Sequence, residues 1–168
     1  MRSAPLARCF IKGVNMKAII SSALIFLSVL LAYMRSLDLR ERLDGTEDLF
    51  DLANAVKSNF NSGMRPLHVI SSDFFTVKNG KNINFNSPDE LISYLNEKYG
   101  DLPFISEFVG ILALIPISVG GELMENCEKL RALAENGVNE SKTRYKMDSS
   151  SGYILFPGLI SIFILILI

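Results

Sequence analysis

Two long stretches of this sequence contain no charged residue, and that absence is its most informative feature. Residues 18–34 and 153–168 are rich in Ile, Leu, Phe and Val. Uncharged apolar stretches of this kind partition into a lipid bilayer. We therefore predict a basic N-terminal segment (1–17), a transmembrane helix (18–34), one central domain (35–152) and a C-terminal transmembrane helix (153–168).

Acidic residues are missing before Asp38, whereas basic residues are not. The basic residues that precede the first apolar run are Arg2, Arg8, Lys12 and Lys17. Such an N-terminus is typical of a signal anchor, and a mitochondrial presequence has a similar composition. We expect an uncleaved anchor because no small-x-small cleavage site closes the run. The expected location is the bacterial inner membrane, with the mitochondrial inner membrane as the alternative.

Motifs of enzymes and cofactor sites are also missing. His68 is the only histidine, and no spacing of carboxylates or thiolates around it supplies the other ligands of a metal site. Ser71, Ser72 and Asp73 follow it, but a turn rich in Ser and Asp needs no catalysis, and there is no G-x-S-x-G nucleophile elbow. Gly120-Gly121 lacks the rest of a phosphate-binding motif. We expect no catalytic, cofactor-binding or metal residues, and no enzymatic activity.

Cysteine and net charge restrict the chemistry further. Cys9 and Cys127 lie on either side of the first apolar run, so a bilayer between them would forbid a disulfide. Cys127 is expected to be a small buried hydrophobe. A net charge of -1 gives no long-range field that would attract nucleic acid. Nucleic acid is therefore not an expected partner. The expected partners are membrane lipids and other membrane proteins, because short membrane helices gain stability by packing laterally.

The first half of the central domain predicts helices followed by a β-hairpin. Residues 35–43 continue the first membrane helix, and Asp44-Gly45-Thr46 is expected to break it. Residues 47–60 place Leu and Val on one helical face, and Asn61-Ser62-Gly63 ends that helix. Strands are predicted at 67–71, 74–78 and 83–85, with Asn79-Gly80 as a two-residue hairpin turn.

The second half predicts two amphipathic helices. Ser87-Pro88-Asp89-Glu90 has the pattern of a capping box, and its helix is expected to run to Tyr99 and stop at Gly100. A second helix is expected over 122–136, with Gly137 as its stop. Its apolar stripe contains Leu123, Cys127, Leu130 and Ala134. A polar linker, 142–152, then leads to the last apolar run.

The run 104–121 has two interpretations. A strand over 109–115, buried in the core, explains its continuous apolar character. A third membrane helix explains it too, although Glu107 would cost about 2.5 kcal/mol at the bilayer centre. In that case Glu107 would be a functional carboxylate, a proton or cation partner. We prefer the core segment.

One resemblance follows from the order of these elements. The predicted elements are, in order, an anchor, a hairpin, the helix opened by Ser87-Pro88-Asp89-Glu90-Leu91, an apolar strand and a helix ending at Val138. This order is similar to that of the ExbD/TolR proteins. The resemblance covers residues 67–138 and implies an ion-coupled transport component. Two departures are that residues 18–34 lack the coupling aspartate of that family and that the family lacks an apolar C-terminal tail.

The sequence therefore predicts an α+β fold, in which a hairpin and amphipathic helices form a small domain between two transmembrane helices. The expected function is a non-enzymatic interaction, accessory or structural subunit of a membrane complex. The alternatives are an ExbD/TolR-like component and a three-span transport or immunity factor. The N-terminus is expected in the cytoplasm and the domain outside. Asn139-Glu140-Ser141 is a glycosylation sequon that matters only in a secretory lumen.

Overall fold

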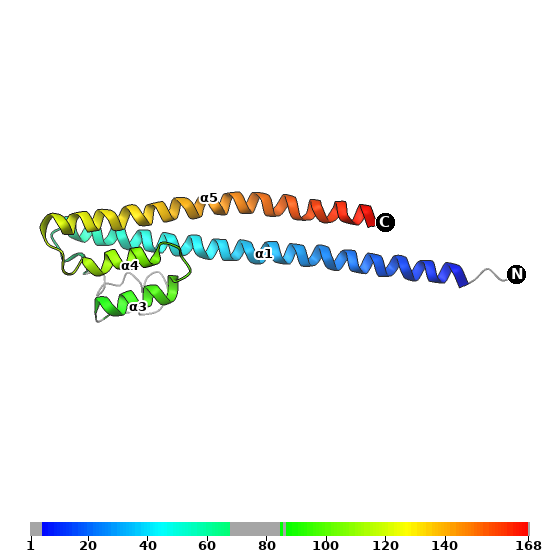
Figure 1. Ribbon diagram of the computed structural model, residues 1–168, viewed down its shortest axis with the longest axis horizontal. Helices are drawn as coiled ribbons and strands as arrows, with labels where there is room; N and C mark the ends of the chain where they lie inside the picture. The colour runs from blue at the N-terminus through cyan, green and yellow to red at the C-terminus, as the bar shows by residue number, and fades with distance from the viewer. Residues whose placement is uncertain (1–4, 68–84, 86, 168) are drawn as a thin grey trace. The chain divides into compact units, whose positions relative to one another are not determined.

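The computed structural model describes the backbone of residues 5–67, 85 and 87–167, and the side chains of 22–67, 85, 87–148, 159, 160 and 163. The helices in this part of the chain are α1 (Pro5–Asn61), α3 (Pro88–Tyr99), α4 (Ile105–Leu114) and α5 (Gly120–Leu167) (Figure 1). The chain divides into two compact units: unit 1 comprises Met1–Arg40 with Arg144–Ile168, and unit 2 comprises Glu41–Thr143. Both α1 and α5 contribute to each unit.

The expected α+β fold is wrong, because the described residues form helices and their connections and contain no strand. The predicted strand over 109–115 falls instead on α4 and the turn that follows it. The buried residues of α4 are Ile105, Phe108, Val109 and Leu112, spaced as on one face of a helix. A short apolar run fits a buried strand and a buried helix equally well, which explains the error. Most of the predicted hairpin, 68–84, lies outside the described residues.

Two predicted helix breaks are also wrong. Helix α1 continues through Gly45, and α5 continues through Gly137 and the expected linker 142–152. An aromatic ring covers each glycine. A Cβ atom at Gly45 would lie 3.2 Å from Cδ1 of Tyr99, and one at Gly137 would lie 2.4 Å from Cε1 of Phe104. These glycines therefore let a ring approach the helix backbone closely, and the packing outweighs their cost of about 1 kcal/mol in a helix.

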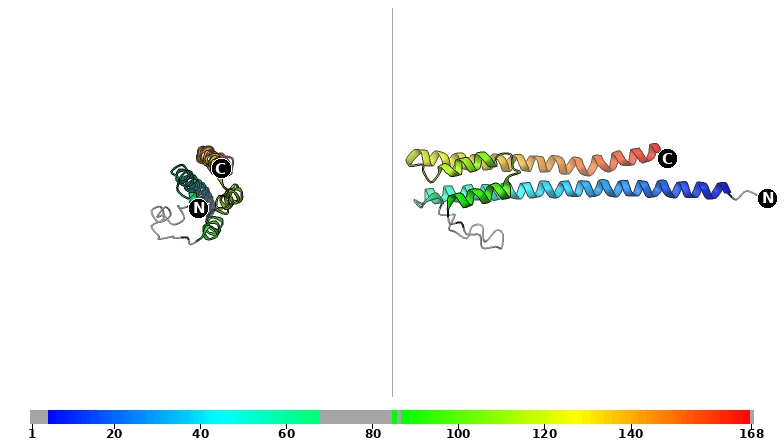
Figure 2. Two further views of the ribbon diagram at one scale, coloured as in Figure 1. Left: turned by 90° about the vertical axis from the view of Figure 1, so that its left-hand side faces the viewer. Right: turned by 60° about the horizontal axis from the view of Figure 1, so that its bottom comes forward.

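The core of unit 2 is formed by one apolar stripe from each helix. Figure 2 shows the ribbons of these helices in two further views. Within each stripe the buried residues recur every three or four positions, with adjacent pairs such as Leu52 and Ala53 on the same face, as in an amphipathic helix. The stripe expected on α5 is confirmed for Cys127, Leu130 and Ala134, while Leu123 is half-buried. The fully buried members on the other helices include Leu49, Leu52, Ala53, Val56, Leu95 and Phe108.

Two predicted helix ends are confirmed. Helix α3 begins after Ser87, whose Oγ accepts a hydrogen bond from the Glu90 backbone N–H at 3.3 Å, and Pro88 occupies the first helical position. Helix α1 ends at Asn61. There the N–H of Met64 donates to the Asn59 carbonyl at 2.9 Å, and Gly63 adopts φ 73°. This is a Schellman end, in which only glycine is free of strain at the positive φ.

A polar cluster attaches α3 to α1 in unit 2. Oη of Tyr99 donates to Oδ2 of Asp48 at 2.8 Å, and Nζ of Lys98 lies 3.7 Å from the same oxygen. The Lys98 ammonium also lies 4.8 Å from the centroid of the Tyr99 ring. Burial of the Tyr99 hydroxyl, together with its hydrogen bond to the Asp48 carboxylate, raises the pKa of Tyr99 above its ordinary value.

Helices α1 and α5 pair antiparallel within unit 2, and polar contacts fix their register. These contacts are Lys57 Nζ to Glu128 Oε1 at 2.6 Å, Arg131 Nε to Asn54 Oδ1 at 3.1 Å, and Lys142 Nζ to Glu47 Oε1 at 3.1 Å. Partly exposed ion pairs contribute about 1 kcal/mol or less each. The contacts therefore specify which turns of the two helices meet, while the core supplies most of the stability.

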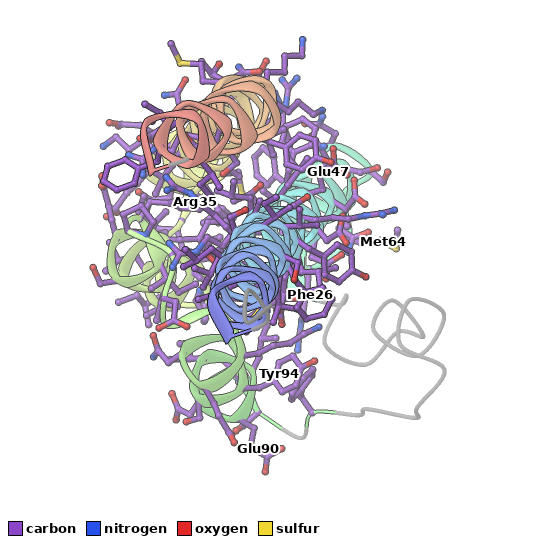
Figure 3. All side chains as sticks on the ribbon, turned by 90° about the vertical axis from the view of Figure 1, so that its right-hand side faces the viewer. Phe26, Arg35, Glu47, Met64, Glu90 and Tyr94 are labelled. Carbon is purple, nitrogen blue, oxygen red and sulfur yellow. The ribbon has the colours of Figure 1, made fainter. Side chains whose placement is uncertain are left out.

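In the part of unit 1 with described side chains, the polarity pattern is opposite to that of unit 2, and most large apolar side chains lie outside. Helix α1 exposes Leu24, Ile25, Phe26, Leu27, Val29, Leu30, Leu31, Tyr33 and Met34. Figure 3 shows Phe26 projecting outward from α1. Three less exposed positions of α1 are small and lie four residues apart: Ser28 is buried, and Ala32 and Ser36 are half-buried. Such small residues let membrane helices approach closely. Arg35 pairs with Asp148 of α5 at 3.0 Å.

The packing of Gly137 against Phe104 generates a prediction. Gly137→Ala should lower the free energy of unfolding of unit 2 by about 1–3 kcal/mol, because the new methyl group overlaps the ring. Gly110→Ala is the matched control: no atom lies within 4 Å of its Cβ position, and alanine should stabilise α4 by about 0.5–1 kcal/mol. Urea unfolding of the full chain in detergent micelles measures both. Equal stabilisation by the two variants would contradict the ring packing.

The Tyr99 hydroxyl generates a pH prediction. In the unfolded chain a tyrosine loses its proton near pH ~10, whereas folded Tyr99 keeps its proton because its pKa is raised. Above about pH 10 the unfolded state therefore binds fewer protons, and the free energy of unfolding falls as pH rises. Tyr99→Phe should weaken this alkaline loss in unfolding curves between about pH 8 and 11. An unchanged slope would exclude Tyr99 as its source.

Candidate interaction surface

The residues singled out from the sequence are not gathered into one site by the described structure. His68, Ser71, Ser72 and Asp73 lie outside the described residues. Glu107 is exposed in the first turn of α4. The Gly120-Gly121 pair forms the beginning of α5. Among the described residues, no group of three or more His, Cys, Asp or Glu side chains could hold a metal ion.

Two further candidates lie on α5. Cys127 is buried in the core of unit 2, and that burial raises the pKa of its thiol. A buried, protonated thiol is a poor nucleophile. The sequon at Asn139 lies within α5, with Asn139 and Glu140 exposed and Ser141 half-buried. Cys127 and Asn139 therefore do not belong to a common site.

The most unusual surface in unit 2 is the turn between α4 and α5. Four large apolar side chains are exposed there within eleven residues: Leu114 (44%), Ile117 (75%), Val119 (77%) and Met124 (55%). We call these four residues the apolar tip. Isolated exposed apolar residues are ordinary, whereas several of them around one turn make that turn a candidate contact surface.

The apolar tip lies at one end of unit 2. The contact between Lys57 and Glu128 pairs α1 and α5 antiparallel, so that the end of α1 and the beginning of α5 lie at the same end of the unit (Figure 1). Met64, which follows the end of α1, is a further exposed apolar residue (49%) at this end. The chain enters unit 2 at Glu41, about 30 Å of helix before Asn61.

Buried polar groups hold the tip in its conformation. Ser118 and Asn126 are each 6% exposed, although Ser118 stands between the exposed residues Ile117 and Val119. Nδ2 of Asn126 donates to Oγ of Ser118 at 2.8 Å, and Oγ of Ser118 donates to the Leu114 carbonyl at 2.8 Å. Gly120, at φ 59°, then redirects the chain into α5. The polar side chains thus point inward while Ile117 and Val119 point outward.

The sequence segment that contains the apolar tip carries acidic charges only. From Tyr99 to Glu128 the sequence contains no Lys, Arg or His, and its charged residues are Asp101, Glu107, Glu122, Glu125 and Glu128. Glu125 pairs with Lys129 at 2.6 Å, which lowers the pKa of Glu125, and Glu128 pairs with Lys57. Within the described chain, Glu107 and Glu122 form no ion pair. Among the described residues, the apolar tip is therefore flanked within its own segment by two carboxylates without an ion pair, those of Glu107 and Glu122.

Sequence analysis missed this surface because it treated 104–121 as one apolar segment. Two signals were present. Pro116, Ser118 and the glycines at 120 and 121 interrupt the run and indicate a turn. The absence of cationic residues between Lys98 and Lys129 is visible by inspection. Which side of the turn faces inward depends on the hydrogen bond from Asn126 to Ser118. Sequence spacing alone does not reveal that pair.

Helix α1 supplies a second functional feature. From Ser22 onward it is long and apolar enough to cross a membrane, and only 6% of its apolar window is buried. It is the one helix that meets this criterion in the part of the chain with described side chains. A membrane anchor and a signal sequence near the N-terminus both have this property. Comparison of the chain with protein-family models, curated proteins and solved structures gave no match.

The pair of buried polar residues yields a prediction. Asn126→Ala should destabilise unit 2 by about 1–3 kcal/mol, because Ser118 loses a buried hydrogen-bond donor. Hydrogen exchange followed by mass spectrometry should show faster exchange in the peptide that covers the α4–α5 turn. Asn136→Ala is the control, since Asn136 is exposed on the same helix. If both variants left the turn equally protected, the Asn126–Ser118 contact would not hold it.

Proposed function

We propose that this protein is an integral membrane protein that acts as a non-enzymatic interaction subunit, with the apolar tip of unit 2 as its contact surface. The observation that carries the proposal is the inverted polarity at the α4–α5 turn, where Ser118 and Asn126 are buried and Ile117 and Val119 are exposed. A freely soluble domain gains nothing from this arrangement. A partner that covers the two apolar side chains would account for it.

The surface of unit 1 supports the membrane assignment. A bilayer solvates outward-facing apolar side chains such as Phe26, which is 70% exposed, whereas water does not. A signal anchor that stays attached also explains why α1 continues without a break into unit 2. The same composition occurs in a cleaved signal sequence, so membrane retention is the property to test. The C-terminal run 153–168 remains a prediction of a second membrane helix.

The two alternative functions gain no specific support. The ExbD/TolR resemblance depended on an apolar strand over 109–115, and that segment is helical instead. The three-span alternative requires 104–121 to cross the bilayer. Helix α4 has ten residues, and a helix of that length spans about 15 Å of the roughly 30 Å hydrocarbon core. Its buried residues pack against the core of unit 2, and Glu107 is exposed.

Membrane retention tests the proposal directly. Leu27→Arg places a cation within the apolar run of α1 and should cost about 3 kcal/mol of insertion free energy. We expect the variant to be degraded or to leave the membrane fraction during carbonate extraction, while the unmodified chain stays in the pellet.

The matched control is Met64→Arg, which adds the same charge at an exposed apolar residue outside the run. That variant should remain in the membrane fraction. If Leu27→Arg were retained as fully as the control, the run 18–34 would not be required for anchoring. Cleavage of the unmodified chain after the run would instead identify α1 as a signal sequence.

A further inference from the structure

We infer that the partner of the apolar tip is a different protein that presents an apolar pocket edged with Lys or Arg side chains. The inference rests on the proposed function and adds the chemistry of the partner. It is carried by two independent observations in unit 2: the exposed side chains of Ile117 and Val119, and the all-acidic charge of the sequence between Lys98 and Lys129.

The shape of the tip favours a protein pocket. Ile117 and Val119 project on either side of Ser118, whose hydroxyl is fixed by Asn126 and the Leu114 carbonyl. These contacts order the turn before it binds, so that little conformational entropy is lost when the apolar side chains enter a pocket. Protein interfaces combine an apolar centre of this kind with a polar, solvated edge.

The charge of the tip argues against a lipid surface. Segments that lie in the membrane interface typically carry Lys and Arg beside their apolar side chains, because many membranes have anionic headgroups. The apolar tip has Glu122 three residues beyond Val119, and Glu107 seven residues before Leu114. Two helical turns separate Glu107 from Leu114, so the two residues share the exposed side of α4. Anionic headgroups would repel both carboxylates.

The same charge argues against a second copy of this chain joined tip to tip. A symmetric contact joins the same surface patch of both copies, so residues at the edge of the patch meet edge residues of the other copy. Because the segment between Lys98 and Lys129 carries acidic charges only, Glu107 and Glu122 would then face an acidic edge. Like charges placed together in this way suppress an association, and opposite charges favour it. A cationic edge on another protein satisfies both carboxylates.

Photo-crosslinking tests this inference with the full-length protein in the cells that express it. A benzophenone amino acid replaces Ile117, which is exposed, and in a parallel strain it replaces Asp89, an exposed residue on α3. We expect a discrete protein adduct at position 117 that is absent at position 89. Mass spectrometry of the adduct identifies the partner and the attached peptide, which should carry Lys or Arg.

Charge-reversal variants in the same crosslinking experiment test whether the partner has a cationic edge. The double change Glu107→Lys and Glu122→Lys should lower the yield of the adduct roughly tenfold, because it places cations opposite the cationic edge of the partner. Glu97→Lys is the matched control: Glu97 is exposed on α3, and its reversal should leave the yield unchanged. Unaltered thermal unfolding of each purified variant shows that the fold is intact.

The outcomes separate the two proposals. An adduct with lipid, with a second copy of the chain, or with a protein in a charge-independent manner would overturn the inferred partner and leave a membrane-anchored interaction subunit standing. The absence of any adduct at position 117, in cells where carbonate extraction finds the protein in the membrane, would overturn both the partner and the use of the tip as a contact surface.

Discussion

The antiparallel pairing of α1 with α5 is the constraint on which unit 2 depends. The contacts between Lys57 and Glu128, and between Asn54 and Arg131, set which turns of the two helices meet. That register places the end of α1 beside the beginning of α5 and thereby determines where the α4–α5 turn emerges. A shift by one helical turn would move these helices by about 5.4 Å and separate the polar partners. Tyr99 and Phe104 then pack against the glycines of the two long helices.

Polarity is arranged in opposite ways in the two units. Unit 2 buries apolar stripes and exposes charges over most of its surface, as expected for a domain in water. Unit 1 exposes Phe26 and Leu31 and turns a small polar residue, Ser28, inward, as expected for helices in lipid. The apolar tip departs from the rule within unit 2. Such a local departure requires a reason, and the hydrogen bonds of Ser118 show that the outward side chains are held in place rather than displaced by chance.

The sequence predicts the helix ends that have a local cause. It does not predict that α1 and α5 continue through glycines at which a break was expected. Ser87 and Gly63 act through hydrogen bonds within a few residues, so the sequence contains the whole signal. Gly45 and Gly137 have the same local signal for a break, but rings more than thirty residues away decide the outcome. The segment 109–115 was misassigned because a continuous apolar run has no period. The candidate surface was hidden for a related reason: its exposure depends on Asn126, a partner in the next helix.

The separation in sequence between α1 and α5 has a consequence for the order of folding. Asn54 and Arg131 are 77 residues apart, so closing that contact costs loop entropy that neighbouring helices such as α3 and α4 do not incur. During synthesis the α1 and α3 stripes of the core emerge from the ribosome well before Leu130 and Ala134 can join them. Nascent unit 2 therefore carries uncovered apolar side chains until α5 is made. A chain truncated before α5 would present those side chains permanently to chaperones and proteases.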